Sequence, residues 1–400
     1  MPEDRPHLTI IGAGPTGIEA ALAAHEHGYG FTLYEQSNDV ASYMRSWGHV
    51  RLFSPWDLDV SPRARRLLTE LGEEVPEGSE CPTGTELVER VLRPLAASDL
   101  IAPCLELGIR VIAISREGLL KNDAVGDPVR AKHPFRLLLK DTDGREWAVS
   151  TEIVLDCTGS YGHPNPLGAG GIPAPGESQL EEMIVRTIPD FDQDSEIWAG
   201  KTTLLVGAGY SAQTAVVELG RLAEKHPSTR VIWVVRKPHS NWKIVPDDPL
   251  PARAELTRRA EGLAGFATEA VLCISGVVVD TLERHNGRIS VLLRHQDQET
   301  TKVEVDRILS LTGFHGDYEM YRQLQVHECW ATSGPMKLAS ALLGSSSSDC
   351  LDQASLGAET LANPEPNFFI LGSKSYGRNS TFLMRVGWEQ VDDVFSFLQR

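Results

Sequence analysis

The chain has 400 residues, of which 41% are hydrophobic and 23% are charged, so it is long enough for two or three domains with substantial cores. Its formal net charge of −17 argues against nucleic acid or an anionic membrane as a partner. No apolar run approaches the length of a transmembrane helix, and none of the six cysteines forms a C-x-x-C pair. We therefore expect a cytoplasmic globular protein without a bound metal or a redox-active dithiol.

The stretch from His7 to Gln36 predicts a dinucleotide-binding βαβ unit. An apolar strand over 8–11 leads directly into glycines in the spacing G-x-G-x-x-G, then into an Ala-rich helix over 18–28 and a second strand over 31–34. The glycines permit a tight turn, admit a pyrophosphate and let the helix pack closely, and an acid after the second strand accepts hydrogen bonds from a ribose diol. A purely structural βαβ unit is the alternative. The expected cofactor contacts are Gly12, Gly14, Pro15, Thr16, Gly17, Glu35 and Gln36.

The same order of elements occurs a second time. A strand over 202–206 leads into a second turn in which Ala212 replaces the third glycine, followed by a helix over 210–225 and a strand over 231–235. After each βαβ unit come three strands, at 109–114, 135–139 and 146–150 in the first copy and at 277–282, 289–293 and 302–305 in the second. Each copy then has an apolar strand that ends in Thr-Gly. The repeat predicts an α/β fold with two Rossmann-like domains, each with a three-stranded β-meander, the second domain being inserted in the first.

Residues of opposite charge close the second strand of the two copies. Glu35 suits the free ribose diol of FAD or NAD, whereas Arg236 suits the 2′-phosphate of NADPH. We therefore expect FAD on the first turn and NADPH on the second, although Arg236 could also be a solvated strand-end residue and Ser211 a helix N-cap. The expected NADPH contacts are Gly207, Gly209, Tyr210, Ser211, Ala212, Arg236 and Lys237.

Domain boundaries follow from the repeat. The first part of the FAD-binding domain is predicted at 1–165, a Pro- and Gly-rich linker at 166–198, the NADPH-binding domain at 199–306 and the second part of the FAD-binding domain at 307–400.

From about His7 to Gln390 the chain resembles the two-dinucleotide-binding-domain flavoproteins, and most of all the flavin-containing monooxygenase group. The resemblance implies cofactor contacts for Trp47, for Val111, whose backbone would meet the adenine, and for Thr158 and Gly159, which end a segment matching the Ala-Thr-Gly motif of the family. Two features of the family are absent from the sequence: a Gly-Gly pair before Trp47, and the fingerprint F-x-G-x-x-x-H between Gly159 and Gly200.

Catalytic candidates lie in the last 30 residues and beside the first Thr-Gly. A strand over 368–371 leads into Gly372, another expected cofactor contact, and a final helix is expected from about Thr381. Arg378, Asn379 and Ser380 precede that helix, and family members place a helix start at the flavin, so these residues and the helix N-terminus could stabilise negative charge on reduced flavin. A helix that only packs is the alternative. Of the histidines, His163 is the most plausible catalyst.

Two dinucleotide sites in one chain predict hydride transfer between cofactors. The favoured hypothesis is an FAD-dependent, NADPH-using monooxygenase that forms a flavin hydroperoxide and uses O2 to oxygenate a small nitrogen, sulfur or carbonyl compound. An NADPH-dependent flavin reductase or oxidase without substrate oxygenation is the second hypothesis. A non-catalytic flavin-binding sensor or scaffold is the third. A homodimer is compatible with the sequence. The sequence does not identify the substrate.

Overall fold

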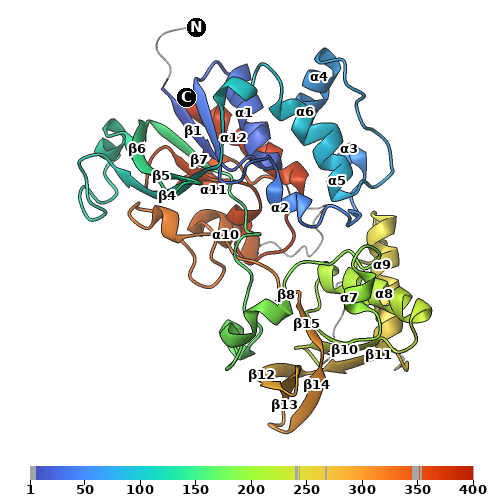
Figure 1. The fold of residues 1–400 in the computed structure, drawn as a ribbon. Coiled ribbons are helices and arrows are strands. Elements are labelled where there is room, and N and C mark those ends of the chain that lie inside the picture. The colour runs from blue at the N-terminus through green and yellow to red at the C-terminus, as the bar shows by residue number, and fades with distance from the viewer. Residues whose placement is uncertain are drawn as a thin grey trace. The chain divides into compact units, whose positions relative to one another are not determined.

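The computed structural model describes residues 6–238, 242, 244–265, 268–344, 351 and 354–399, which form two compact units (Figure 1). The first unit comprises Met1–Gly48, Ser54–His163 and His315–Arg400. The second comprises His49–Phe53 and Pro164–Phe314, so the second unit is inserted in the first.

A five-stranded parallel sheet is the centre of the first unit. Its strand order is β16-β7-β1-β2-β3. The N-terminal strand β1 therefore lies between β2, the next strand in the chain, and β7, which comes much later. The pairing of β1 with both β2 and β7 is parallel throughout. The strands are β1 (Leu8–Ile11), β2 (Phe31–Glu35), β3 (Leu105–Leu107), β7 (Ile153–Asp156) and β16 (Phe368–Ile370).

A three-stranded antiparallel sheet of β4 (Ile109–Arg116), β5 (Phe135–Asp141) and β6 (Glu146–Thr151) accompanies the parallel sheet. An Asp-Gly turn joins the last two strands: the Gly144 N–H donates to the Asp141 carbonyl, and Gly144 has a φ of 86°. The helices of this unit include α1 (Pro15–Glu26), α2 (Ser42–Arg45), α3 (Trp56–Asp59), α4 (Pro62–Glu70), α5 (Gly84–Leu87), η1 (Val88–Leu92), α6 (Arg93–Ala96), α10 (Met336–Gly344), α11 (Ala358–Leu361), η7 (Gly372–Tyr376) and α12 (Met384–Leu398).

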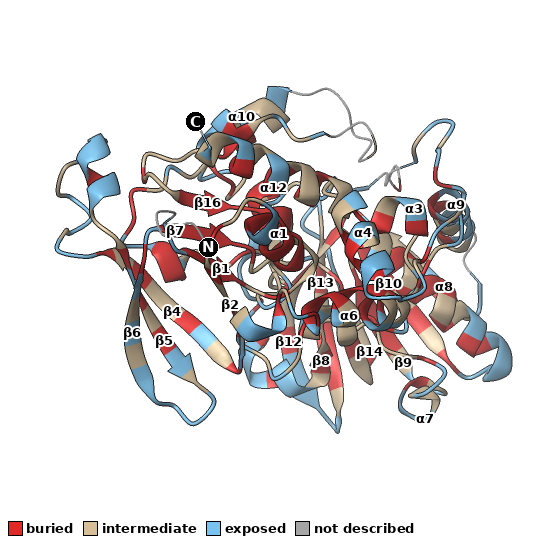
Figure 2. Ribbon diagram, turned by 90° about the horizontal axis from the view of Figure 1, so that it is seen from above, coloured by how far each residue is buried: buried red, intermediate tan, exposed pale blue. Residues whose placement is uncertain are grey.

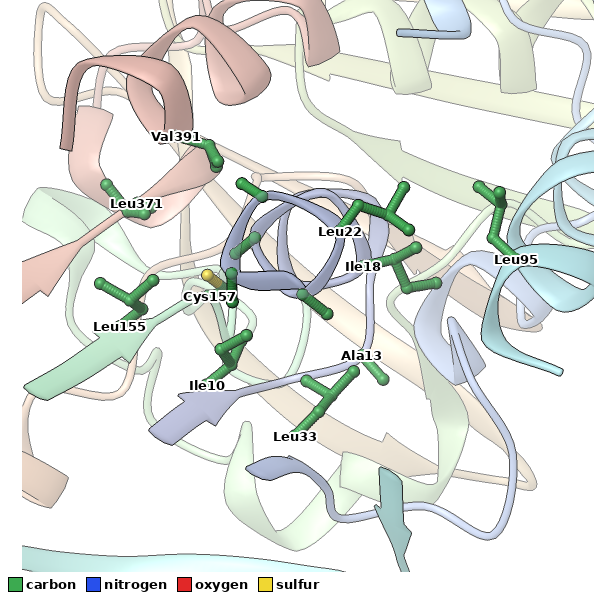
Figure 3. Packing of buried hydrophobic residues seen from close by; sticks show 14 of the residues in the cluster. Ile10, Ala13, Ile18, Leu22, Leu33, Leu95, Leu155, Cys157, Leu371 and Val391 are labelled. Atoms are coloured by element: carbon green, nitrogen blue, oxygen red, sulfur yellow. The ribbon is translucent and has the colours of Figure 1, made fainter. Parts of the chain in front are cut away.

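Helix α1 is buried on nearly all sides, which its run of small residues allows (Figure 2). Figure 3 shows side chains of the parallel strands, the C-terminal segment and α6 arranged around it, among them Ile10, Leu155, Val391 and Leu95. The largest hydrophobic core of the molecule is therefore built around the helix that begins at the first glycine turn.

The second unit repeats this plan. Its parallel sheet has the order β11-β10-β9-β15-β8, and its antiparallel sheet the order β12-β13-β14. The strands are β8 (Ile184–Val185), β9 (Thr202–Val206), β10 (Arg230–Val235), β11 (Val271–Ser275), β12 (Val277–His285), β13 (Arg288–His295), β14 (Thr300–Val305) and β15 (Arg307–Ser310). The helices include α7 (Ser195–Trp198), α8 (Tyr210–Lys225) and α9 (Pro251–Gly265).

The predicted fold class is confirmed, since each unit pairs a parallel Rossmann-like sheet with a three-stranded meander. One helix was missed, and the expected start of another was wrong. Helix α9 was not predicted, because its sequence begins in a Pro-rich run that suggested a loop. The final helix begins at Met384 rather than Thr381, and the residue at its N-cap is Leu383, which has no side-chain capping group.

A fully buried cluster of one carboxylate and two guanidinium groups joins β4 to the segment before β16. Glu365 pairs with Arg116 at 2.7 Å and with Arg130 at 2.8 Å, and all three side chains have zero exposure. The Gln325 N–H also donates to Glu365. Burial alone would raise the pKa of Glu365, but hydrogen bonds from Arg130, Gln325 and Arg116 lower it, so the ionised form is stabilised in the folded chain.

We predict that Glu365→Ala lowers the free energy of unfolding by about 3–5 kcal/mol, because two buried guanidinium groups lose their counter-ion. The matched control is Glu117→Ala, which removes an exposed pair with Arg136 and should cost less than about 1 kcal/mol. Urea denaturation of both variants measures the difference. Equal losses would contradict the role assigned to the buried cluster.

Candidate functional site

The first glycine turn has the backbone contacts that its spacing predicts. Gly12 has a φ of 96°, and a Cβ there would lie 2.9 Å from the Cys157 carbonyl oxygen. A Cβ on Gly17 would lie 1.8 Å from the Gly12 carbonyl oxygen. Gly14, at the N-cap of α1, has no atom within 4 Å of its Cβ position, and no side chain caps the helix. The first turn of α1 therefore has no side-chain cap, and Gly14 leaves room for an anion to approach the backbone.

Glu35 is the last residue of β2 and is buried. Its carboxylate accepts one hydrogen bond from the Ala13 N–H and one from the Ser37 N–H, both at 2.9 Å. Glu35 thus fixes the glycine turn, and each of its oxygens keeps a lone pair for a further donor. The adjacent Gln36 is exposed and donates to the Tyr43 hydroxyl.

The carboxyl ends of three neighbouring parallel strands bring further predicted residues to this turn. Thr158 and Gly159 follow β7, and Gly372 follows β16. A Cβ on Gly372 would lie 2.8 Å from Thr16 Oγ1, so the first turn of α1 packs directly against this glycine. This edge of the sheet is where α/β proteins bind their ligands.

Trp47 has an unusual buried polar atom. Its Nε1 is buried and has no hydrogen-bond partner among the described residues. The indole packs on Gly84, where a Cβ would lie 2.9 Å from the ring, a contact that the sequence did not suggest. An unpaired indole N–H fits a site that receives a polar ligand. Val111, which the family resemblance also implies, is a buried residue of β4.

The structure corrects the expected setting of Arg378, Asn379 and Ser380. They lie in a loop four or more residues before α12 and do not start the helix. Asn379 Oδ1 accepts hydrogen bonds from the N–H and hydroxyl of Thr381, and the Arg378 N–H donates to the Thr332 carbonyl. The helix N-terminus therefore cannot act through these residues, and the charge of the exposed Arg378 is the remaining candidate.

His163 lies beside a second histidine that the sequence did not single out. The two rings, of His163 and His315, have centroids 5.6 Å apart, and His163 Nε2 lies 3.9 Å from Asp317 Oδ2. Burial lowers the pKa of His315, and the charges of His163 and Arg378 lower it further, while Asp317 opposes them. His315 is therefore mainly neutral at neutral pH. The repeat could have pointed to it, because it follows the second Thr-Gly as His163 follows the first.

The second glycine turn, like the first, has a glycine with open space around its Cβ position at the N-cap of the helix. Gly207 has a φ of 139°, and a Cβ there would lie 2.3 Å from the Leu311 carbonyl oxygen. Gly209, at the N-cap of α8, has nothing within 4 Å of its Cβ position and no side-chain cap. Ser211 is therefore inside the helix rather than at its N-cap. Ala212 is fully buried, so the third position of this turn accommodates a methyl group.

Around that turn, the Tyr210 ring lies 5.1 Å from the Phe53 ring. Arg236 and Lys237 directly follow β10 and are exposed. No carboxylate of the described ranges pairs with either side chain. Two unneutralised cations at the end of the strand next to an open glycine turn suit a phosphate monoester.

No cluster of three or more metal-ligating side chains occurs among the residues that the structure describes. Within those same residues, no helix is both long and apolar enough to cross a membrane.

Comparison with known proteins identifies the fold. No protein-family model matches the chain. A 72-residue stretch is 39% identical to a probable FAD-dependent monooxygenase of Arthroderma benhamiae, but it spans only 18% of this chain and 16% of that protein. Solved structures with similar folds include bacillithiol disulfide reductase from Bacillus cereus, with a TM-score of 0.67 and 17% identity over 99% of each chain. Ornithine hydroxylase from Pseudomonas aeruginosa has a TM-score of 0.63 and 15% identity over 99% of each chain.

This chain has the fold of the two-dinucleotide-binding-domain flavoproteins. The similar structures include both disulfide reductases and hydroxylases, so the fold is shared by different chemistries.

We predict that Gly17→Ala lowers the free energy of unfolding by at least about 2 kcal/mol, because the new methyl group would displace the Gly12 carbonyl. The matched change Gly14→Ala places its methyl group in open space and should cost less than about 1 kcal/mol. Thermal or urea unfolding of the two variants without added cofactor tests the geometry of the turn. A larger loss in Gly14→Ala would contradict it.

Proposed function

We propose that this chain is an FAD-dependent, NADPH-using oxidoreductase, and specifically a monooxygenase that uses O2 to oxygenate a small nitrogen, sulfur or carbonyl compound. One observation carries the proposal. Two uncapped helix N-termini each have an open glycine; the strand after the first helix ends in Glu35, and the strand after the second is followed directly by Arg236. The acid suits a free ribose diol and the unpaired cation suits a ribose 2′-phosphate.

The first turn is proposed to hold FAD. Gly14 leaves room for the pyrophosphate, Glu35 has lone pairs for the adenosine ribose, and the Trp47 indole N–H lacks a partner. Bound FAD would supply two-electron chemistry, taking a hydride from the nicotinamide and passing electrons to oxygen. The 72-residue match to a probable FAD-dependent monooxygenase supports FAD as a cofactor of the chain.

Side chains of this protein would bind and orient the two nucleotides and would accept or hold protons. Arg236 and Lys237 would clamp the 2′-phosphate, with Gly209 and Ser211 at the pyrophosphate. In the first unit, the positive charge of Arg378 would stabilise negative charge on the reduced flavin. His315, being mainly neutral, can accept a proton at a ring nitrogen, and His163 lies near both His315 and Asp317.

An NADPH-dependent reductase or oxidase is the second candidate. It is favoured by the absence of the F-x-G-x-x-x-H fingerprint from the sequence and by the similar folds of bacillithiol disulfide reductase and thioredoxin reductase. The oxygen reaction separates these functions, since only a monooxygenase transfers an oxygen atom to a substrate.

Arg236→Ala should weaken NADPH binding about 10- to 100-fold, because it removes a charge-assisted contact to the 2′-phosphate. NADH lacks that phosphate, so its affinity should change less than about twofold. Arg221→Ala is the control, because Arg221 is exposed on α8 and pairs with Glu218. Titration of each variant with both nucleotides checks the prediction, and equal weakening of NADPH and NADH would refute the assigned contact.

The oxygen reaction can be followed directly. The FAD-loaded protein is reduced by NADPH without air, and oxygen is then admitted while the flavin spectrum is recorded. A monooxygenase should show a lasting absorption band that belongs to neither oxidised nor reduced flavin. Prompt return to oxidised flavin with one hydrogen peroxide per flavin would instead indicate an oxidase or reductase. Absence of any bleaching by NADPH would leave the non-catalytic sensor.

A further inference from the structure

A small cavity lies inside the first unit, beside the first turn of α1. Its volume is about 30 Å³, enough for a single water molecule or hydroxyl group. Its wall includes Pro15, Thr16 and Glu19 of α1, Asp59 at the end of α3, and Met384 and Trp388 of α12. Because the cavity shares Pro15 and Thr16 with the first glycine turn, it adjoins the candidate FAD site.

Asp59, one of the wall residues, has a buried carboxylate oxygen that lacks a hydrogen bond. Asp59 is only 6% exposed. Its Oδ1 accepts a hydrogen bond from the Ser54 hydroxyl at 2.7 Å, whereas its Oδ2 is buried and has no partner in the described part of the chain. Buried polar atoms of this kind are rare in folded proteins, and a bound ligand, ion or water is one explanation for them.

The second carboxylate in the wall is already satisfied. Glu19 accepts hydrogen bonds from the Ser61 hydroxyl at 2.6 Å and from Arg63 at 2.5 Å. Arg63 also binds Glu26 and Asp392. The wall residues from η1, α6 and α12 do not titrate, so Glu19, paired with Arg63, is the only other carboxylate among the described residues that line the cavity.

We propose that Asp59 is a cofactor-binding residue whose Oδ2 accepts a hydrogen bond from a hydroxyl of the sugar-alcohol chain of FAD. The proposal rests on the FAD assignment of the first turn. A hydroxyl group fits the volume of the cavity and supplies the donor that Oδ2 lacks. The phosphates are excluded as the direct partner, because they carry no proton to donate and repel a carboxylate.

The proposed contact links FAD binding to pH. Burial raises the pKa of Asp59 to about 7, with the Ser54 hydrogen bond opposing the rise. A hydroxyl donor stabilises the ionised carboxylate, so the pKa of Asp59 falls when FAD binds and a proton is released. FAD should therefore bind about tenfold more tightly at pH 8 than at pH 6, since the ionised fraction of Asp59 in the free protein rises from about one tenth to about nine tenths between these pH values.

Calorimetric titration of the FAD-free full chain with FAD at pH 6 and pH 8, in buffers of different ionisation enthalpy, measures both affinity and proton release. The wild type should release up to one proton per FAD and show the tenfold pH dependence. Asp59→Asn should lose both effects while still binding FAD. Asp57→Asn is the control, because Asp57 lies on the same short helix but is exposed, and it should behave like the wild type.

Proton uptake on binding, or no proton exchange, would overturn the role of Asp59, and the wild type alone gives this answer even if Asp59→Asn does not fold. An unchanged pH dependence in folded Asp59→Asn would do the same. These outcomes differ from failure of the proposed function, in which the wild type would not bind FAD at either pH.

Discussion

The close approach of helix α1 to the parallel sheet is the constraint on which the first unit depends. It exists because Gly12 and Gly17 have no side chains: a methyl group on either would meet a backbone carbonyl oxygen at less than 3 Å. The same approach buries α1 in the largest core and places its uncapped N-terminus at Gly14. One set of backbone contacts thus provides both the packing of the unit and the proposed phosphate site, which is why the glycines cannot serve one purpose without the other.

A buried ion pair holds together the segments that surround the start of this helix. The Lys374 ammonium group binds Asp156 Oδ2 and also donates to the Asp317 carbonyl oxygen and to Thr158 Oγ1, and both charged side chains have zero exposure. Asp156 in turn accepts hydrogen bonds from the N–H and hydroxyl of Thr158. The pair therefore ties β7, η7 and the segment after His315 to one turn beside the glycines. Its two members are 218 residues apart in the chain.

Local patterns predicted the parts of the fold that depend on local physics. The glycine spacing and the apolar strands placed both βαβ units and both meanders close to their observed limits. The start of α12 was missed because Asn379 and Ser380 look like caps, whereas the Asn379 side chain binds Thr381 in the preceding loop. Asp59, His315 and Lys374 were missed for another reason: their environments come from segments distant in sequence, and burial or a lost hydrogen bond cannot be read from neighbours along the chain.

The central claim is that one chain binds FAD on the Gly12 turn and receives a hydride from NADPH on the Gly207 turn. The most direct test is rapid anaerobic mixing of the FAD-loaded protein with NADPH carrying deuterium or hydrogen at the transferred position of the nicotinamide. The account predicts bleaching of one flavin per chain, slowed by deuterium, and much faster with NADPH than with equal NADH. A chain that retains no FAD, or a bound flavin that NADPH does not bleach, would contradict it.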